Sequence, residues 1–421
     1  MDKFVIKGGK KLFGDVEISG AKNASLALMP ASLLATGNSV LYNTPELNDV
    51  YTMMKLLKHL GVEATFVDRV LFLNTDNIIS QDAPYEHVKK MRASVYVLGP
   101  LLSKFGTAKV SLPGGCAWGP RPINLHIEGL KKMGADIDLQ EGYILANATR
   151  LKGAKINFDV SSVGATGNIL MAATLAKGNT VITNAAMEPE ITNLAEYLVK
   201  MGAKINGINT STLEIEGVDE LTSAEIETIP DRIEAGTLLI AGAITHGEVT
   251  LKNFPAKYFT SVLSKLEDSG CKINIDNNII HLNGANNSIT PSDVTTAIYP
   301  GFPTDMQAQW TAYMTLANGT STVTDSIYID RFKHVPELVR LGADITVKEN
   351  SAVIKGVEKL RGAKVMSTDL RASASLVLAG LAAEGVTEVL RVYHLDRGYQ
   401  KIEEKLKLLG ADIERQVGTE F

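Results

Sequence analysis

One internal repeat constrains what this chain of 421 residues can fold into. A turn of the form glycine, small residue, any residue, apolar residue occurs six times, as in LGADITV, with glycines 68 to 73 residues apart at Gly61, Gly134, Gly202, Gly270, Gly342 and Gly410. A second series has nearly the same period and interleaves with the first, with glycines at Gly37, Gly106, Gly178, Gly247, Gly319 and Gly385. Because two series with one period are hard to obtain by chance, the sequence predicts six copies of one structural unit.

Each copy combines two kinds of helix with four strands. An apolar run such as NILMAATLAKG predicts a buried helix that a glycine closes at its C-terminus. A β-branched strand such as NTVIT follows, and then an amphipathic helix such as ITNLAEYLVKMGA. After the repeated glycine, ADITV and SAVIKG predict a hairpin. The unit is therefore strand, helix, strand, helix, strand, strand.

Six such units with apolar helices predict an α/β protein whose sheets lie outside its helices. A chain of this length with 45% hydrophobic residues favours two domains, each with three units, divided near residue 229. Tandem repeats of this kind suit an enzyme with a cleft between two domains, or a ring-like clamp on nucleic acid. The net charge of -5 disfavours the clamp, because binding to a phosphate backbone needs a surplus of basic residues.

Composition also limits the place and the chemistry of the protein. The two cysteines, Cys116 and Cys271, have no metal-ligand spacing and suit a reducing compartment. Neither a signal peptide nor a membrane-spanning run is found, which predicts a soluble cytoplasmic protein without membrane insertion. The seven histidines are scattered, with His126 the only weak candidate for a supporting role. Since no Walker or dinucleotide-binding motif occurs, we expect neither a cofactor nor a metal.

The stretch PGGCAWGPRPINLH carries the most reactive candidate, Cys116. A lone cysteine is more often an inert core residue, but the glycines and prolines over residues 113–122 predict a loop in which the thiol can be reached. Arg121 and a helix beginning at Asn124 would favour a thiolate and an anionic substrate. We interpret the loop as a catalytic lid.

Charged and polar residues recur at the predicted starts of the helices. They are Lys22, Asn23, Arg92, Ser162, Thr166, Arg232, Asp305, Asp369 and Arg371 at the buried helices, and Arg121, Glu188, Glu190, Arg331 and Arg397 at the amphipathic ones. Equivalent repeats would bring them to one end of each domain, which suits a polyanionic small molecule. Taken singly, each is a cap or a solvated charge; Asp305 is either an N-cap or a general base.

Several motifs together carry a resemblance over residues 1 to 420. SGAKNASLAL, GGCAWGPRPINLH, SVGAT, GFPTDMQAQ, RFKHVPEL, DLRASASLVLAG and HLDRGYQ resemble the UDP-N-acetylglucosamine 1-carboxyvinyltransferase family of the EPSP synthase superfamily. The resemblance implies a two-domain inside-out α/β barrel with six βαβαββ repeats, three per domain, and the active site in the interdomain cleft. It further implies that residues 22–229 form one domain and that residues 1–21 join residues 230–421 in the other.

The resemblance also implies a reaction. The enolpyruvyl group of phosphoenolpyruvate would pass to the 3-hydroxyl of UDP-N-acetylglucosamine through a tetrahedral intermediate, with release of phosphate. This is the first committed step of peptidoglycan precursor synthesis, on which cell shape and cell division depend. Cys116 would be the general acid and the target of fosfomycin, Asp305 would take the hydroxyl proton, and Asp369 would support the reaction centre. The phosphate would be held by Lys22, Arg121 and Arg397, and the carboxylate by Arg331 and Arg371.

The implied nucleotide-sugar site is larger, and the sequence departs from the family pattern at three places. The implied contacts are Asn23, Arg92, Arg121, Pro122, Ile123, Asn124, Leu125, Ser162, Val163, Gly164, Asp305 and Ile327. Asn124 stands where the family usually has Asp, which affects a charged contact or the helix cap. Val160 and Ser161 replace a basic residue of some members, and Trp118 is a bulky lid residue.

Three other functions stay open from the sequence. The sister enzyme 5-enolpyruvylshikimate-3-phosphate synthase shares fold and chemistry, a catalytically weak paralogue would act as a nucleotide-sugar sensor, and the nucleic-acid clamp is the remaining one. For the transferase we expect small-molecule substrates and no nucleic acid. We expect it to be a monomer or a weak homo-oligomer.

Overall fold

The computed structural model describes residues 2–89, 91–112, 123–284 and 288–417, and the chain divides into two compact units. Unit 1 comprises Met1–Ser19 and Pro230–Phe421, and unit 2 comprises Gly20–Ile229. Cys116, Arg121, Pro122 and Trp118, which the sequence analysis singled out, lie outside the described residues.

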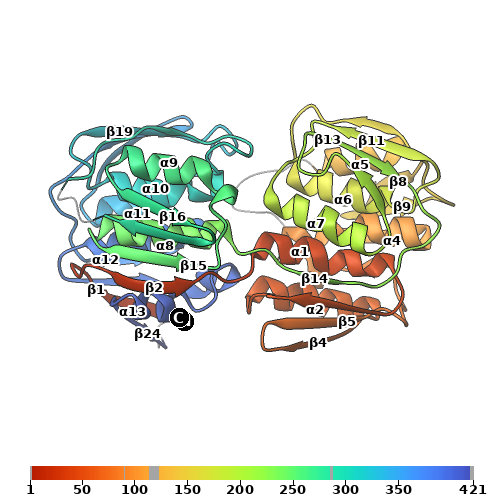
Figure 1. Cartoon of the computed structure of the whole chain (residues 1–421), viewed down its shortest axis with the longest axis horizontal. Helices are drawn as coiled ribbons and strands as arrows, with labels where there is room; N and C mark the ends of the chain where they lie inside the picture. The colour runs from red at the N-terminus through yellow and green to blue at the C-terminus, as the bar shows by residue number, and fades with distance from the viewer. Residues whose placement is uncertain (1, 90, 113–122, 285–287, 418–421) are drawn as a thin grey trace. The chain divides into compact units, whose positions relative to one another are not determined.

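Each unit contains three four-stranded sheets with one shared order (Figure 1). In unit 2 the orders are β14(Glu225–Glu227)-β3(Asn38–Tyr42)-β5(Val70–Asn74)-β4(Glu63–Val67), β6(Asp82–Ala83)-β7(Thr107–Ser111)-β9(Tyr143–Asn147)-β8(Asp136–Gln140) and β10(Lys155–Asn157)-β11(Asn179–Thr183)-β13(Thr212–Glu216)-β12(Lys204–Asn206). In unit 1 they are β2(Phe13–Glu17)-β15(Glu248–Lys252)-β17(Ile279–Asn283)-β16(Lys272–Asp276), β18(Val294–Thr295)-β19(Thr320–Thr324)-β21(Ser351–Lys355)-β20(Asp344–Lys348) and β22(Lys364–Met366)-β23(Val386–Leu390)-β1(Lys3–Lys7)-β24(Asp412–Gln416).

The pairing inside each sheet repeats as well. The first two strands in each order are parallel, and the other two neighbouring pairs are antiparallel. Parallel strands need a crossover, and a buried helix supplies it in four sheets, as α6 (Val163–Ala173) does between β10 and β11. The predicted repeat of strand, helix, strand, helix, strand, strand is confirmed.

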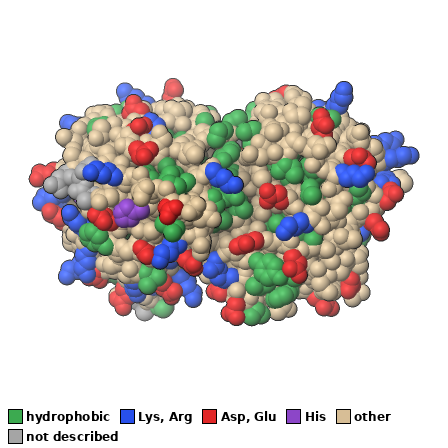
Figure 2. All heavy atoms as spheres, in the orientation of Figure 1, with side chains coloured by type: hydrophobic (Ala, Val, Ile, Leu, Met, Phe, Trp, Pro, Cys, Tyr) green, Lys and Arg blue, Asp and Glu red, His purple; other side chains and the backbone are tan. Residues whose placement is uncertain are grey.

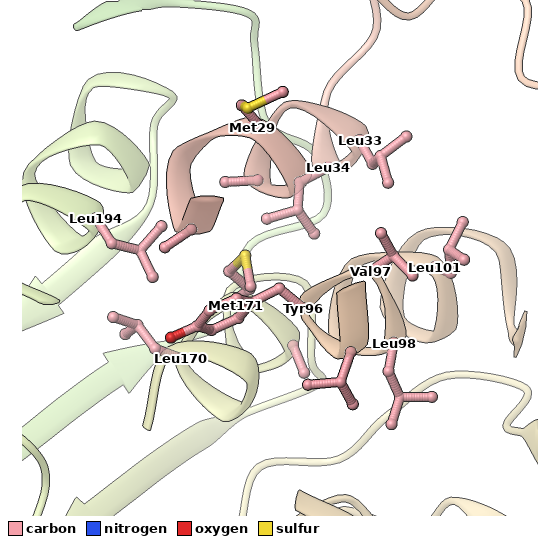
Figure 3. Close-up of a cluster of buried hydrophobic side chains, with 14 of the residues drawn as sticks. Met29, Leu33, Leu34, Tyr96, Val97, Leu98, Leu101, Leu170, Met171 and Leu194 are labelled. Carbon is pink, nitrogen blue, oxygen red and sulfur yellow. The ribbon is translucent and has the colours of Figure 1, made fainter. Parts of the chain in front are cut away.

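Apolar helices fill the inside of each unit, as the sequence predicts. These are α1 (Lys22–Ala31), α4 (Leu98–Phe105) and α6 in unit 2, and α8 (Arg232–Ile244), α10 (Gln307–Met314) and α12 (Leu370–Ala382) in unit 1. Every residue of α8 is buried, and so is every residue of α10. Figure 3 shows the unit 2 core, in which side chains from several helices point together: Met29, Leu33, Leu34, Tyr96, Val97, Leu98, Leu101, Leu170, Met171 and Leu194. The inside-out α/β fold class is thus confirmed.

Amphipathic and short helices complete the repeats. The amphipathic ones are α2 (Asn48–Leu60), α5 (Asn124–Lys132), α7 (Pro189–Lys200), α9 (Thr260–Asp268), α11 (Val335–Arg340) and α13 (Ile402–Leu408). The short ones are α3 (Tyr85–Val88), η1 (Ser32–Leu34), η2 (Arg92–Val97), η3 (Ala256–Tyr258), η4 (Thr304–Met306) and η5 (Val392–Arg397). Acidic and basic side chains are interspersed over the face shown in Figure 2. Within the described residues, no helix is long and apolar enough to cross a membrane.

The repeated glycines explain the period in the sequence. All six glycines of the first series have positive φ, from 89° at Gly134 to 109° at Gly61, a conformation that side chains disfavour. In the second series every glycine but Gly247 also has positive φ. At that turn the preceding His246 has the positive φ, 52°, and Gly247 is needed for space, because a Cβ there would lie 2.0 Å from the Leu12 carbonyl oxygen.

The prediction that these second glycines close the buried helices is wrong for all of them but α4, since the C-caps of α1, α6, α8, α10 and α12 are Ser32, Thr174, Thr245, Thr315 and Ala383. Helix α6, for example, ends at Ala173, five residues before Gly178. The Thr174 hydroxyl donates to the Met171 carbonyl at 2.7 Å, and this bond competes with continuation of the helix. A glycine C-cap is found at α4, which Gly106 closes with φ 75°.

The first two strands of the chain complete sheets of unit 1. β1 lies between β23 and β24 and is antiparallel to both, while β2 pairs in parallel with β15. Figure 1 shows these red strands beside green and blue elements. In the other five sheets the last two strands form a hairpin of consecutive strands, whereas β24 and β1 stand at opposite ends of the sequence.

Candidate active site

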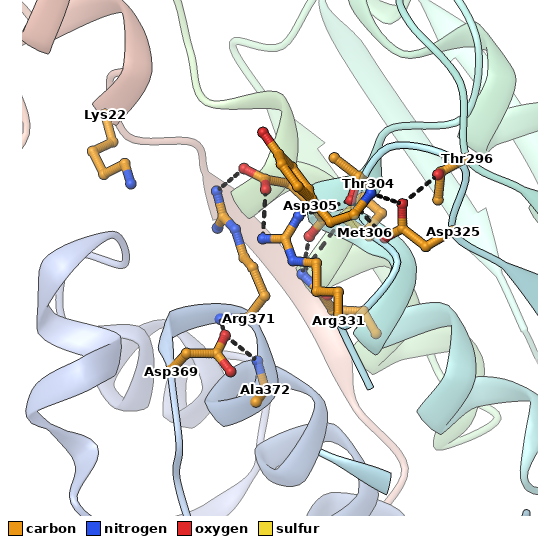
Figure 4. Close-up of polar contacts among 12 residues, drawn as sticks. Lys22, Thr296, Thr304, Asp305, Met306, Asp325, Arg331, Asp369, Arg371 and Ala372 are labelled. Carbon is orange, nitrogen blue, oxygen red and sulfur yellow. Dashed lines mark hydrogen bonds and ion pairs between the residues drawn. The ribbon is translucent and has the colours of Figure 1, made fainter. Parts of the chain in front are cut away.

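The charged centre of unit 1 is Asp305 with two buried arginines (Figure 4). One Asp305 oxygen, Oδ1, accepts from Arg331 Nη2 at 2.8 Å, and the other, Oδ2, accepts from Arg371 Nη2 at 2.7 Å. The arginine side chains are 8% and 4% exposed, whereas the Asp305 side chain is 26% exposed. The carboxylate is therefore the part of the cluster that solvent or a ligand can reach.

Local structure explains why Asp305 faces the arginines. It lies in η4, whose N-cap is Pro303, so Asp305 is not the N-cap that the sequence left open. Arg371 lies in the first turn of α12, and Arg331 precedes α11. Burial disfavours the charged Arg371, but Asp305 and other acidic neighbours outweigh it and raise the pKa of Arg371. Arg371 is thus a permanent cation beneath an accessible carboxylate.

Asp369 fixes the start of α12. Its Oδ1 accepts from the backbone N–H groups of Arg371 at 3.0 Å and Ala372 at 3.1 Å, which makes it the N-cap of α12. Asp231 caps α8 in the same way, through Ile233 and Glu234. The caps fix the first turn of each helix, and for α12 this is the turn that carries Arg371.

Three residues that the sequence analysis missed connect to this centre. Thr304 accepts from Arg331, and Asp325 accepts from the Thr304 hydroxyl at 2.7 Å. The Tyr399 hydroxyl accepts from Arg371 at 3.2 Å. Thr304 stands in GFPTDMQAQ and Tyr399 in HLDRGYQ, so both motifs were recognised, but nothing in either marks these side chains as partners of the arginines.

Unit 2 has its own cluster of helix starts. Ser162 is the N-cap of α6 and accepts from the Ala165 N–H at 3.3 Å, and the Val163 carbonyl accepts from the Tyr96 hydroxyl at 3.3 Å. Burial and then the charges of Glu188 and Glu190 raise the pKa of Tyr96, which keeps its phenol protonated. These contacts bring η2, the start of α6 and the acidic start of α7 near one another.

His126 joins this cluster as a neutral group. The Asn168 amide donates to the Val95 carbonyl at 2.8 Å, and its oxygen accepts from the Gly99 N–H, so its nitrogen faces His126 Nδ1 at 3.0 Å as a donor. Burial and then the charge of Arg92 lower the pKa of His126 to about 4. A Cβ on Gly164 would lie 3.2 Å from His126 Nε2, which explains a glycine there.

The other predicted residues are placed individually. Lys22, the first residue of α1, has its ammonium nitrogen 3.8 Å from Asp49 Oδ2. Ile123 is the N-cap of α5 without a side-chain bond, so exposed Asn124 does not cap the helix. Asn23, Leu125, Ile327 and Arg397 are half-buried, and the Ile327 N–H donates to Asp325 at 3.0 Å. Val160 is 64% exposed.

No group of three His, Cys, Asp or Glu residues with metal-binding geometry occurs in the part of the chain that the structure describes. In unit 1 the described site places two guanidinium groups beside one accessible carboxylate, and guanidinium groups are suited to binding anions.

A family model matches almost the whole chain. The model described as EPSP synthase (3-phosphoshikimate 1-carboxyvinyltransferase) matches residues 6–406, so the chain belongs to this family of carboxyvinyl transferases. Two solved structures share the fold: the enolpyruvyl transferase NikO from Streptomyces tendae, with a TM-score of 0.89 and 24% identity over 99% of both chains, and EPSP synthase from Acinetobacter baumannii, with a TM-score of 0.76 and 19% identity over 99% of this chain and 100% of that one.

Two curated relatives resemble the chain more closely than these structures do. The chain is 59% identical over its whole length to a protein of Chloroherpeton thalassium, 99% of which is covered, and 53% identical to one of Geotalea daltonii, with 99% of both covered. Both relatives are named UDP-N-acetylglucosamine 1-carboxyvinyltransferase.

Proposed function

We propose that this protein transfers the enolpyruvyl group of phosphoenolpyruvate to the 3-hydroxyl of UDP-N-acetylglucosamine and releases phosphate. The observation that carries the proposal is full-length identity of 53% to 59% with curated 1-carboxyvinyltransferases of this nucleotide sugar. The family model that matches residues 6–406 favours the same reaction class. The likeness to 5-enolpyruvylshikimate-3-phosphate synthase structures, at 19% to 20% identity, supports the shared fold alone.

The unit 1 centre suits the carboxylate of phosphoenolpyruvate. Arg331 and Arg371 already hold one carboxylate, that of Asp305, through one nitrogen each. Guanidinium groups bind carboxylates through planar, charge-assisted hydrogen bonds, so a substrate carboxylate fits the same pair. In the proposed reaction, Lys22, Arg397 and Arg121 hold the phosphate group.

Proton transfers complete the proposed mechanism. The Cys116 thiol gives a proton to the methylene carbon while the sugar hydroxyl oxygen bonds to the adjacent carbon, and Asp305 accepts the hydroxyl proton. Loss of phosphate from the tetrahedral intermediate and of a proton from its methyl group then restores the carbon–carbon double bond. Asp369 supports this step through the first turn of α12.

The nucleotide sugar is assigned to residues of unit 2, with Asp305 and Ile327 from unit 1. They are Asn23, Arg92, Arg121, Pro122, Ile123, Asn124, Leu125, Ser162, Val163 and Gly164. Hydrogen-bond donors at the start of α6 suit its diphosphate. We further propose that the enzyme acts in the cytoplasm, in peptidoglycan precursor synthesis for cell shape and division, as a monomer or weak homo-oligomer, and that fosfomycin modifies Cys116.

Phosphate release tests the function. We expect phosphoenolpyruvate to release phosphate with UDP-N-acetylglucosamine but not with shikimate 3-phosphate. Because Asp305 is the proposed base, Asp305→Ala is expected to lower kcat by roughly 10²- to 10⁴-fold, the usual contribution of a general base. Cys116→Ser is also expected to reduce kcat. Asp344→Ala, which removes an exposed carboxylate from β20, serves as the control.

The other functions give different results in the same assay. Release with shikimate 3-phosphate alone would assign the sister activity. Binding of the nucleotide sugar without any release would leave a sensor.

A further inference from the structure

The two arginines at Asp305 are held by the same device. Each donates through Nη2 to one Asp305 oxygen and through Nη1 to a hydroxyl, which is Thr304 for Arg331 at 2.9 Å and Tyr399 for Arg371 at 3.2 Å. Two contacts on two nitrogens fix both the position and the rotation of a planar guanidinium group. The hydroxyls therefore set how the arginines present themselves to a carboxylate.

The direction of each hydrogen bond at Thr304 is determined. Asp325 is buried and accepts from Thr296 at 2.7 Å and from the Ile327 and Tyr328 N–H groups, all through Oδ1. Its other oxygen, Oδ2, accepts the Thr304 proton at 2.7 Å. Because the proton points to Asp325, a Thr304 lone pair faces Arg331.

The directions at Tyr399 are determined as well. The Thr237 hydroxyl gives its proton to the Ile233 carbonyl at 2.8 Å, so it can accept the Tyr399 proton at 2.9 Å. The Tyr399 oxygen then accepts from Gln309 Nε2 at 3.1 Å and from Arg371. Tyr399 is 1% exposed, and burial raises its pKa, so the hydroxyl stays protonated and keeps this polarity.

Gln309 connects this network to Asp305. Its Nε2 also donates to the Asp305 backbone carbonyl at 3.0 Å. The Tyr399 hydroxyl thus has partners on α8, α10 and α12. One of them, Gln309, also binds the backbone of Asp305, the residue whose side chain Arg371 holds.

We infer that Thr304 and Tyr399 are positioning residues that orient Arg331 and Arg371 for the carboxylate of phosphoenolpyruvate. The inference rests on the proposed function and adds two residues to it. Neither hydroxyl needs to touch a substrate. Each hydroxyl acts through the arginine from which it accepts a hydrogen bond. Loss of the hydroxyl should therefore weaken binding of phosphoenolpyruvate and leave binding of the nucleotide sugar unchanged.

Steady-state kinetics test the inference. Tyr399→Phe removes one acceptor of a charged donor, and we expect the KM for phosphoenolpyruvate to rise about tenfold. The KM for UDP-N-acetylglucosamine should stay within about twofold. Thr304→Val should act in the same direction, and Thr304→Ser, which keeps the hydroxyl, should restore most of the loss.

Tyr313→Phe is the matched control for a buried hydroxyl. Tyr313 is also 1% exposed in unit 1, and its hydroxyl bonds to Ser269 and Cys271 without an arginine. If Tyr399→Phe and Tyr313→Phe shift both KM values equally, the inference is overturned. A KM change for the phosphoenolpyruvate substrate in Tyr399→Phe alone supports it.

A crystal structure of Tyr399→Phe separates the inference from the proposed function. We expect the Arg371 guanidinium to rotate away from its contact with Asp305 Oδ2. If the wild-type protein does not release phosphate, the proposed function fails, and this rotation still reports on the positioning role. An unmoved guanidinium would refute that role whatever the activity.

Discussion

At the residue scale, His126 shows how burial decides a protonation state. Its Nδ1 accepts from Asn168, its ring is 6% exposed, and burial together with Arg92 lowers its pKa to about 4. A second buried histidine, His334, has its pKa lowered to about 3 by burial and then by Arg331. Both rings are therefore neutral at pH 7 and resist protonation in the folded chain.

This predicts a loss of stability in acid. The folded pKa of His126 lies below the ordinary value of 6.5, so its contribution is complete above pH 6.5 and is lost as the pH falls towards 4. The shift corresponds to at most about 3 kcal/mol of unfolding free energy. Urea unfolding of unit 2 followed from pH 7 to pH 4 should show a shallower decline for His126→Gln.

Two comparisons make the measurement specific. Lys131→Gln removes an exposed side chain from α5, the helix that carries His126, and should leave the decline as in the wild type. His334 lies in unit 1, so His126→Gln should not change the acid sensitivity of that unit. Equal slopes for His126→Gln and the wild type in unit 2 would contradict the assignment of a neutral His126.

At the element scale, close approach of buried helices depends on single glycines. Gly99 in α4 packs against α6, where a Cβ would lie 2.4 Å from both the backbone oxygen and the side-chain oxygen of Asn168. Asn168 also orients His126, so crowding here reaches the cluster of helix starts.

Gly99→Ala is therefore expected to destabilise unit 2 by about 2–3 kcal/mol, because the clash includes backbone that cannot rotate away. Gly380→Ala in α12 is the control, since the nearest atoms there are side-chain atoms 3.2 Å from the new Cβ. Thermal unfolding measures both, and equal midpoints for Gly99→Ala and the wild type would contradict the packing described.

Elements also show what the sequence can predict. The turn glycines need positive φ, a local requirement, so Gly61 and its five equivalents revealed the repeat and the fold class. The end of α6 was misjudged because Thr174, not the later glycine, terminates the helix. Local patterns predict turns and buried helices well, and helix ends less well.

In the candidate site, too, the sequence predicts residues that belong to local motifs and misses pairs that packing brings together. Arg371 and Asp305 stand at helix starts with recognisable motifs, and they meet as an ion pair. Thr304 and Asp325 are 21 residues apart, and Arg371 and Tyr399 are 28 apart. Such pairs are brought together by packing between elements, so no spacing within one segment indicates them.

At the scale of the whole molecule, the two units differ in how the sequence builds them. All three sheets of unit 2 come from residues 38–227, whereas unit 1 needs β1 and β2 from residues 3–17. β1 lies between β23 and β24, so its removal separates two strands of the sheet. A fragment of residues 20–229 has all its sheet partners, and one of residues 230–417 does not.

We therefore predict that residues 20–229 fold alone, with cooperative unfolding, and that residues 230–417 do not. Fusing residues 2–19 after residue 417 through an Asn-Gly turn should restore folding, because Gln416 pairs with Lys3 as Val347 pairs with Ala352, one pair before a two-residue turn. Circular dichroism and urea unfolding of the three fragments check this. A cooperative transition in residues 230–417 alone would contradict it.

Because β1 and β24 pair but are far apart in the sequence, they also limit when their sheet can form during synthesis. During synthesis β1 emerges first, yet its partner β24 ends 413 residues after β1 begins, from Lys3 to Gln416. At translation rates of about 5–20 residues per second, roughly 20–80 s pass between the synthesis of β1 and that of β24. Unit 2 completes all its strands in the interval. The first and the last strands that the structure describes thus share one sheet, and that sheet can close only after the middle of the chain has been synthesised.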